Sequence, residues 1–475
     1  MPVTNLQRVK VLHKFSANLL YFSFVPLILS FYFPYFSFIM LLIFFINLDK
    51  KPVKSAFFTF LPYIFFIYSG VFLSMYRFYG LNFFIALLLY SILVFYHFLY
   101  LFMPVYLYKK IRFNILLLPF VFVTFEYLKD NFLFGLPLGD FSIFVYNIPF
   151  FIKDAAIFGQ YFISLKLIFI NLSFYLILKG EKIKVALIFV AVLICFIIPY
   201  EKPQSVLKNK TISVVQANIP QNEKWSNIYL SRNLKRYISM SKGLKSDVII
   251  WPESSYPYLF SQDRDEEFIK FLKDSRFNII FGAVRKENQA YFNSAVFFKK
   301  GKFEYYNKRN LVPFAEFIPL RTIISDIMPS SIDPGDFKKG ETGRIFRLDD
   351  LKIAPLICYE ENFMKLSRDY KDRGANILTV LTNDAWFDKS PTFYMFPRSD
   401  VFMAVENRIW VIRVANTGIS EIVNPYGKIV SHIEPDTREV MTKTLNITVF
   451  KRTLFDRYGY LFPFLVVFIS LFILL

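Results

Sequence analysis

Residues 351–361 read LKIAPLICYEE, and this stretch decides how the second half of the chain is interpreted. Its first seven residues form a short apolar run without alternation, which is typical of a strand buried on both faces of a sheet. The run ends on Cys358, which Tyr359 and two glutamates follow. Because ligand sites in open α/β sheets gather beyond the carboxyl ends of strands, the stretch predicts a functional cysteine there.

The chain around this stretch alternates strand-like and helix-like segments. DVIIWPE and ANILTVLTND are two more apolar runs, and they end on Glu253 and on Asn383 with Asp384. Helix-like patterns lie between runs of this kind. The alternation predicts a layered α/β domain over residues 205–450, and the chemistry is expected beyond the carboxyl ends of these strands.

The first 200 residues have a different composition. The chain is 55% hydrophobic and contains 61 Phe, and these residues concentrate before position 200. We therefore expect a membrane bundle over residues 1–200 and one last span over 458–475. For spans of about 17–25 residues, there are eight candidates, although seven or nine remain open: Phe15–Phe31, Phe33–Leu48, Ala56–Phe78, Asn82–Leu107, Asn114–Leu128, Ala156–Leu178, Val185–Pro199 and Tyr460–Leu475. The broken stretch Phe132–Phe150 is interpreted as a re-entrant or interfacial loop.

Positive charge in the short loops predicts the orientation of this bundle. Four loops that alternate with less basic ones would lie in the cytoplasm, which places the α/β domain on the extracytoplasmic side. The basic residues of these loops are Arg8, Lys10, Lys14, Lys50, Lys51, Lys54, Lys109, Lys110, Arg112, Lys179, Lys182 and Lys184.

Charge and cysteine content exclude other classes. The net charge is +19, but the basic residues flank apolar runs and form no tract interleaved with aromatics, so no nucleic-acid partner is expected. Besides Cys358 the chain has one cysteine, Cys195, inside an apolar run, which makes a disulfide framework improbable. No spacing typical of a zinc site is present, and no metal or cofactor is expected.

A cysteine nucleophile needs a base, and the composition offers few histidines. The chain has only His13, His97 and His432; the first two lie in or beside the membrane part, and a Cys–His pair would have to use the third. A carboxylate can serve instead if burial raises its pKa, and Glu253 is the best placed. The simpler alternatives are a buried apolar role for Cys358 and solvated positions for Glu253 and Lys308.

Five stretches together resemble the nitrilase superfamily: WPES, NKRNLVPFAEFIP, ICYEE, LTNDAWF and ENRIWVIRVANTG. Seven spans, such a domain and one final span resemble its membrane-embedded branch, the apolipoprotein N-acyltransferases. The resemblance implies a four-layer αββα sandwich with Glu253 as general base, Lys308 as oxyanion-stabilising residue and Cys358 as nucleophile. By the same resemblance, supporting or substrate-binding roles fall to Glu316, Tyr359, Glu360, Trp225 and Asn383.

The sequence departs from that pattern near Asn383. Ala315 and Asp388 stand where the family commonly has Gly, and Met395-Phe396 stands where it often has Gln-His. None of these positions touches the three catalytic residues. They leave open the conformation of the loop after Asn383 and the lipid preference.

The resemblance implies that Cys358 carries an acyl group from a phospholipid to the α-amino group of the diacylglyceryl-cysteine of an apolipoprotein. The protein would be a monomer in the cytoplasmic membrane of a bacterium. One alternative is a membrane-tethered amidase that uses water as second nucleophile. Another is a silent scaffold or transporter, against which we expect few ionisable residues deep in the spans.

Two apolar loops are expected at the entrance of the site, Phe317–Pro329 and Trp386–Pro397. Both are richer in aromatic and aliphatic residues than ordinary loops. We expect at least one to dip into the outer leaflet through side chains such as Phe393, Met395 and Phe396. The alternative is that both loops pack as core under the sheet.

Overall fold

The computed structural model describes residues 18–132, 135, 137–197, 201–261, 266–274, 278–313, 315–317, 337–459 and 461–474. The chain forms two compact units. The first, here called the helical unit, comprises Met1–Glu201, Lys389–Arg398 and Arg457–Leu475. The second, the sheet unit, comprises Lys202–Asp388 and Ser399–Asp456.

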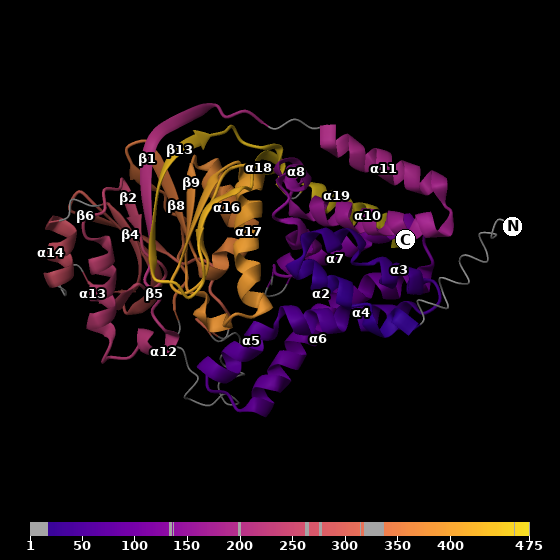
Figure 1. Ribbon diagram of the computed structural model, residues 1–475, viewed down its shortest axis with the longest axis horizontal. Coiled ribbons are helices and arrows are strands. Elements are labelled where there is room, and N and C mark those ends of the chain that lie inside the picture. The colour runs from indigo at the N-terminus through magenta and orange to yellow at the C-terminus, as the bar shows by residue number, and fades with distance from the viewer. Residues whose placement is uncertain are drawn as a thin grey trace. The chain divides into compact units, whose positions relative to one another are not determined.

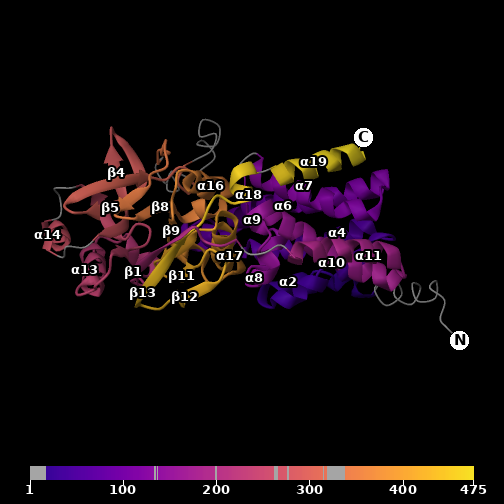
Figure 2. The same cartoon turned by 90° about the horizontal axis from the view of Figure 1, so that it is seen from above.

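Short helical segments build most of the helical unit. Several begin at a proline, which fits the first turn of a helix because that turn does not use the missing N–H. In chain order they are η1 (Leu20–Phe22), α2 (Val25–Tyr32), η2 (Pro34–Ile39), α3 (Leu42–Leu48), α4 (Pro52–Ile67), α5 (Ser69–Leu73), the π-helical turn η3 (Ser74–Phe78), α6 (Phe83–Ile111), η4 (Ile115–Leu117), α7 (Leu118–Asn131), η5 (Phe141–Val145), α8 (Pro149–Ile152), α9 (Ala155–Phe158), α10 (Gln160–Lys179), α11 (Lys182–Ile197), α18 (Leu454–Tyr458) and α19 (Leu461–Leu474). Within this unit α10 packs against α3, α7 and α11 (Figures 1 and 2).

Helix length supports fewer full spans than the eight expected. Among the described residues, α6 and α10 are long and apolar enough to cross a membrane, and α4 with Ser69–Phe78 would add a third span bent by 46°. The remaining apolar helices are shorter, such as Leu20–Tyr32, Pro34–Leu48 and Leu461–Phe472. The count of eight is therefore not confirmed. The described part of Phe132–Phe150 holds only η5 and the start of α8, as its glycines and prolines predict.

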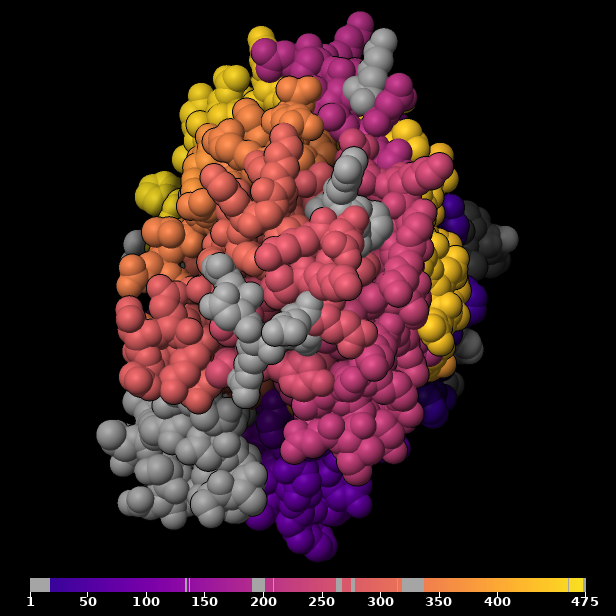
Figure 3. Space-filling model, turned by 90° about the vertical axis from the view of Figure 1, so that its left-hand side faces the viewer, coloured from indigo at the N-terminus to yellow at the C-terminus, as the bar shows by residue number. Residues whose placement is uncertain are grey.

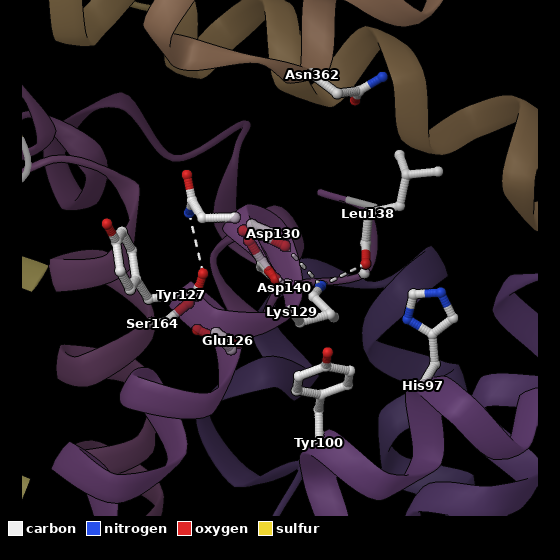
Figure 4. A network of polar contacts seen from close by, with 12 residues as sticks. His97, Tyr100, Glu126, Tyr127, Lys129, Asp130, Leu138, Asp140, Ser164 and Asn362 are labelled. Atoms are coloured by element: carbon white, nitrogen blue, oxygen red, sulfur yellow. Dashed lines mark hydrogen bonds and ion pairs between the residues drawn. The ribbon is translucent and has the colours of Figure 1, made fainter. Parts of the chain in front are cut away.

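Several charged side chains are buried inside the helical unit. The Lys129 ammonium donates to the Leu138 carbonyl and to Asp140 Oδ1, both at 2.6 Å, and lies 3.2 Å from Asp130 Oδ1 (Figure 4). Glu126, on the same helix α7, accepts a hydrogen bond from the Phe141 N–H at 2.8 Å. These contacts tie the segment after α7 back onto that helix. Of these residues only Glu126 lies inside a predicted span, Asn114–Leu128.

Two sheets form the sheet unit. The first has the order β13 (Glu439–Val449), β1 (Ser205–Gln216), β2 (Val248–Ile250), β4 (Ile279–Glu287), β5 (Ala290–Lys299), β6 (Lys302–Asn307), and β3 (Tyr256–Phe260) also pairs with β4. The second has the order β12 (Ile429–Ile433), β11 (Ser420–Val423), β10 (Trp410–Ala415), β9 (Ile377–Thr382), β8 (Leu351–Ile357), β7 (Phe346–Leu348). Around them lie α12 (Gln221–Lys224), α13 (Leu230–Ser241), α14 (Glu266–Asp274), η7 (Cys358–Asn362), α16 (Met364–Asp372), η8 (Asp384–Phe387) and α17 (Pro391–Asn407).

The layers follow the predicted αββα order. Strands β1 and β5 of the first sheet contact β10 and β8 of the second, so the two sheets face each other. Helices α13 and α14 cover the outer face of the first sheet, and α16 and α17 lie beside the second (Figure 1). Seen from the side of α14, the surface comes mainly from the middle of the chain, in pink to salmon (Figure 3). Every residue of β9 and β10 is buried, as continuous apolar runs predict.

The segment Lys389–Arg398 belongs to the helical unit, although residues of the sheet unit flank it in sequence. Phe393, Met395 and Phe396 are enclosed by protein, with 3%, 1% and 2% of their surface exposed. The prediction that these side chains enter the lipid is therefore wrong. The other predicted entrance loop, Phe317–Pro329, lies outside the described residues except for Phe317.

This segment is seated at the break between α4 and α5. The Thr392 hydroxyl donates to the Ile67 carbonyl at 2.6 Å and accepts from the Gly70 N–H at 3.1 Å. The Arg398 guanidinium donates to the Phe31 carbonyl at 2.8 Å. A Cβ added at Gly70 would lie only 2.2 Å from Ser390 Oγ, so this seat requires glycine.

We expect Gly70→Ala to displace Lys389–Arg398 and to lower the free energy of unfolding by about 1–3 kcal/mol, the usual range for overpacking. Trypsin cleavage after Lys389 should accelerate accordingly. Ser69→Ala is the matched control, because the Ser69 hydroxyl bonds only the Phe66 carbonyl of its own helix turn among the described residues. Unchanged cleavage in Gly70→Ala would contradict the assigned seat.

Candidate active site

Cys358 is the first residue after β8 and has a left-handed backbone conformation, with φ at +52°. This region is uncommon for residues other than glycine and is found where a turn presents a side chain for function. Glu360 closes the turn, since its Oε2 accepts a hydrogen bond from the Ile357 N–H at 2.9 Å. The chain therefore leaves the buried strand and turns sharply at the thiol.

Asn293 forms hydrogen bonds with two of the candidate acid–base groups. Its side-chain amide, on β5, donates to Glu253 Oε1 and to Glu316 Oε1, both at 2.8 Å. The Lys308 ammonium, just after β6, lies 2.8 Å from Glu316 Oε2 and 3.9 Å from Glu253 Oε1. Four residues that span positions 253 to 316 of the sequence thus form one cluster. Sequence analysis missed Asn293, although Asn-Ser inside the apolar strand YFNSAVFFK was a usable signal.

Lys308 remains an ammonium in this cluster. Burial lowers its pKa, but the negative charges of Glu316 and Glu253 more than offset burial, so the pKa lies above its ordinary value. Only 1% of the residue is exposed. A fixed, desolvated cation of this kind can stabilise an oxyanion that develops on a reacting carbonyl.

The Cys358 thiol is protonated in the resting protein. Burial and the negative charge of Glu253 raise its pKa to about 12, although Lys308 acts in the opposite direction. Very little thiolate is therefore present near neutral pH. The thiol has to lose its proton as it reacts, and the carboxylate of Glu253 is a neighbouring acceptor for it.

No histidine takes this place among the described residues. His432 lies on β12 and contacts Glu434 Oε1 at 3.0 Å. Three strands separate β12 from β8 in the sheet, which corresponds to about 19 Å at the usual strand spacing. His97 belongs to the helical unit, on α6.

Lys224 is a second buried cation, and sequence analysis did not single it out. Its ammonium, on α12, donates to the backbone carbonyl of Glu253 at 3.0 Å. Burial lowers the pKa of Lys224 to about 8, against the opposing effects of Glu253 and Cys358. The neighbouring Trp225, which was singled out, is 48% exposed. Lys224 therefore holds the main chain of the candidate base.

We expect Lys224→Met to slow acylation of Cys358 by about 10–100-fold, because a buried carbonyl left unpaired costs about 1–3 kcal/mol. In the wild type the rate should fall as pH rises through about 8, where the ammonium loses its proton. Lys224→Arg should move this decline to higher pH, since guanidinium stays charged. The exposed Lys245→Met is the control, and identical pH profiles for the wild type and Lys224→Arg would exclude this role.

The supporting residues have different environments. Glu360 is buried and accepts hydrogen bonds from the Tyr306 hydroxyl at 2.8 Å and from the N–H groups of Arg309 and Asn310 at 2.7 and 3.0 Å. It thereby connects the loop of Lys308 to the turn of Cys358. Tyr359 is buried with its ring edge-on to Phe363.

Asn383 and Arg413 organise the end of β9. The Asn383 amide donates to Gln221 Oε1 at 2.8 Å, which ties β9 to α12. Arg413, fully buried on β10, donates to both carboxylate oxygens of Asp384 at 2.9 Å and pairs with Glu361 and Asp400. Sequence analysis included Arg413 in a family motif but gave it no role.

Comparisons with known proteins show which families the chain resembles. The family described as Carbon-nitrogen hydrolase matches residues 211–453, and the Apolipoprotein N-acyltransferase N-terminal domain matches residues 16–173. An apolipoprotein N-acyltransferase of Geobacter metallireducens is 30% identical over 66% of this chain and 64% of its own length, and one of Rickettsia prowazekii is 28% identical over 74% of each. The solved CN-hydrolase superfamily protein XC1258 from Xanthomonas campestris is 18% identical, with a TM-score of 0.37 over 50% of this chain and 91% of its own.

The chain belongs to the carbon-nitrogen hydrolase family, because that family model covers slightly more than half of it. Within the family it groups with the apolipoprotein N-acyltransferases, whose N-terminal domain precedes the hydrolase-like domain here as well. Membership of this branch makes the protein an acyltransferase, and its apolar helices agree with a membrane protein.

Proposed function

We propose that the protein transfers a fatty acyl chain from a phospholipid to the α-amino group of the diacylglyceryl-cysteine at the N-terminus of a lipoprotein. Cys358 carries the acyl group as a thioester between the two half-reactions. The observation that supports this most is the cluster of Glu253, Lys308 and Glu316 around Asn293, in which the charges of Glu253 and Lys308 act on the Cys358 thiol.

In the first half-reaction Glu253 accepts the thiol proton while the sulfur of Cys358 attacks the ester carbonyl at position sn-1. The Lys308 ammonium stabilises the oxyanion of the tetrahedral intermediate. When the intermediate collapses, the C–O bond breaks and Glu253 returns the proton to the departing alkoxide. Lysophospholipid leaves, and the acyl group stays on sulfur.

In the second half-reaction the neutral amine of the acceptor attacks the thioester. Glu253 accepts a proton from the attacking nitrogen, and Lys308 again stabilises the oxyanion. The C–S bond then breaks, the thiolate takes the proton from Glu253, and the amide product leaves. Donor and acceptor thus react in turn at one thiol, which is a ping-pong cycle.

The proposal includes a placement in the membrane. Residues 1–200 form the bundle with α6 and α10 as full-length spans, shorter helices complete eight crossings, and 458–475 is the last of them. The basic loops lie in the cytoplasm of a bacterium. Residues 205–450 then act on the extracytoplasmic side of the cytoplasmic membrane as a monomer, and Glu316, Tyr359, Glu360, Trp225 and Asn383 position the reacting groups or the substrates.

The test follows the label from donor to acceptor. Purified enzyme is incubated with a phospholipid labelled in its sn-1 chain, and mass spectrometry should find the label on Cys358 of the wild type and none on Cys358→Ala. Addition of a diacylated lipopeptide should move the label into an amide, whereas an N-acetylated lipopeptide should leave it on the enzyme. Release of free fatty acid without amide would instead support a hydrolase.

A further inference from the structure

The helical unit contains a cavity of about 280 Å³ away from the residues assigned to catalysis. It opens where α3, α6 and α10 end and where η4 and α11 begin. Helices α6 and α10 have the length and composition of membrane spans. The shared end of two such helices lies at the level of lipid headgroups. The residues that line the cavity are Asp49, Tyr108, Asn114, Ile115, Tyr175, Leu176, Lys179, Glu181 and Lys184.

Asp49 organises the polar wall of the cavity. It pairs with the Lys179 ammonium, and it accepts from the Tyr175 hydroxyl at 2.7 Å and from the Tyr108 hydroxyl at 3.5 Å. Lys184 lies 3.2 Å from Glu181. The two phenol hydroxyls donate their protons to Asp49 and so hold the Lys179 side of the wall in place. The ammonium groups of Lys179 and Lys184 each pair with one carboxylate and keep further N–H donors that can reach phosphate oxygens.

Positive charge surrounds this opening. The three loops that meet there carry nine basic residues and two carboxylates, a net charge of +7. The positive-inside rule accounts for the charge of such loops. It does not account for a cavity walled by ordered hydroxyl and ammonium groups. The basic residues are Lys50, Lys51, Lys54, Lys109, Lys110, Arg112, Lys179, Lys182 and Lys184.

Apolar side chains next to the cavity remain exposed. On α10, Phe174 and Ile177 are 40% and 55% exposed, within two turns of Lys179. On α11, Ile183 and Leu187 are 78% and 63% exposed. A polar cavity of headgroup size beside exposed apolar helix surface matches the two parts of a phospholipid, its phosphodiester and its acyl chains.

We propose that this cavity binds the headgroup of an anionic phospholipid, with the ammonium groups of Lys179 and Lys184 donating to the phosphodiester. The acyl chains then lie along α10 and α11. By the proposed orientation the lipid belongs to the cytoplasmic leaflet, so it is not the acyl donor that reacts at Cys358. The site gives the enzyme a bound lipid that turnover does not consume.

The test measures which lipid the full-length protein retains. Wild type is purified in detergent with equal amounts of phosphatidylglycerol and phosphatidylcholine, washed, and analysed for bound lipid by mass spectrometry. We expect phosphatidylglycerol to be retained at least about fivefold over phosphatidylcholine. Lys179→Gln with Lys184→Gln should abolish this preference.

The control removes the same charge outside the cavity. Lys110→Gln with Lys182→Gln changes two exposed lysines of the same loops that do not line the cavity, and it should keep the preference within about twofold. An equal loss of the lipid preference in both double variants would mean that the basic loops attract anionic lipid in general, and it would overturn the proposed site. Equal retention of the two lipids by wild type would overturn it as well. Loss of the preference in 10 mM inorganic phosphate would assign the cavity to free phosphate. Thermal unfolding shows whether each variant is folded.

Discussion

Glu253→Gln is expected to slow acylation of Cys358 by phospholipid by about 10²–10⁴-fold, the usual contribution of a positioned base. The same variant should alkylate at Cys358 with iodoacetamide at least as fast as wild type. The negative charge of Glu253 raises the pKa of the thiol. Its removal lowers that pKa and increases the thiolate fraction at a given pH, so the two reactions should respond in opposite directions.

The two rates are measured on the same preparations between pH 6 and 9. Cys358→Ala provides the blank for both. If alkylation falls in step with acylation in Glu253→Gln, then Glu253 keeps the thiol ionised before substrate arrives, and a resting thiol with a pKa of about 12 would be contradicted. The acylation rate of Asn293→Ala should lie between those of wild type and Glu253→Gln, because this variant removes the amide that orients Glu253 and retains the carboxylate.

Arg413→Met is expected to lower the free energy of unfolding by about 3–5 kcal/mol at pH 8, the range measured when one partner of a buried ion pair is removed. The guanidinium is fully buried among Glu361, Asp384 and Asp400. Without it these carboxylates stay buried with no cation. The turn at Asp384, which follows the end of β9, would lose its ion-pair partner.

The loss should depend on pH. Burial raises the pKa of Asp384 to about 7 and that of Asp400 above its ordinary value. A carboxyl with a raised pKa in the folded state takes up its proton on folding, so its burial costs least below the pKa of the unfolded chain and more as pH rises through the folded pKa. The variant should therefore recover part of its stability between pH 8 and pH 5.

The matched control is Arg373→Met, which removes a partly exposed guanidinium paired with Asp369 at 3.5 Å. Its effect should stay below about 1 kcal/mol, as for other surface ion pairs. An equal loss for Arg413→Met at pH 5 and pH 8 would assign the effect to lost packing and would contradict the charge argument. Chemical unfolding in detergent at both pH values measures it.

The sequence by itself indicated which part of the chain lies in lipid and which in water, and it predicted the layers of the sheet unit. The side chains of a continuous apolar run avoid water only in lipid or between the layers of a sheet domain. Composition and run length therefore predict a membrane part and an α/β sandwich. The polar residues that follow β2, β8 and β9 were recognised as Glu253, Cys358 and Asn383. Because β8 and β9 are parallel neighbours in one sheet, strand polarity brings the ends at Cys358 and Asn383 together. Glu253 follows β2 in the other sheet, so only the packing of the two sheets brings it to Cys358.

Only the tertiary structure decided which other side chains complete the site. Asn293, Lys224 and Arg413 act through partners 40, 29 and 29 positions away in Glu253 and Asp384, and no local pattern encodes a contact at that range. The seat of Lys389–Arg398 depends likewise on the missing Cβ of Gly70, more than 300 positions earlier. The predicted helix ends in the helical unit were inaccurate, because hydropathy only shows that a segment is buried in some apolar medium. The positions at which a helix breaks depend instead on prolines and on buried ion pairs such as that of Lys129.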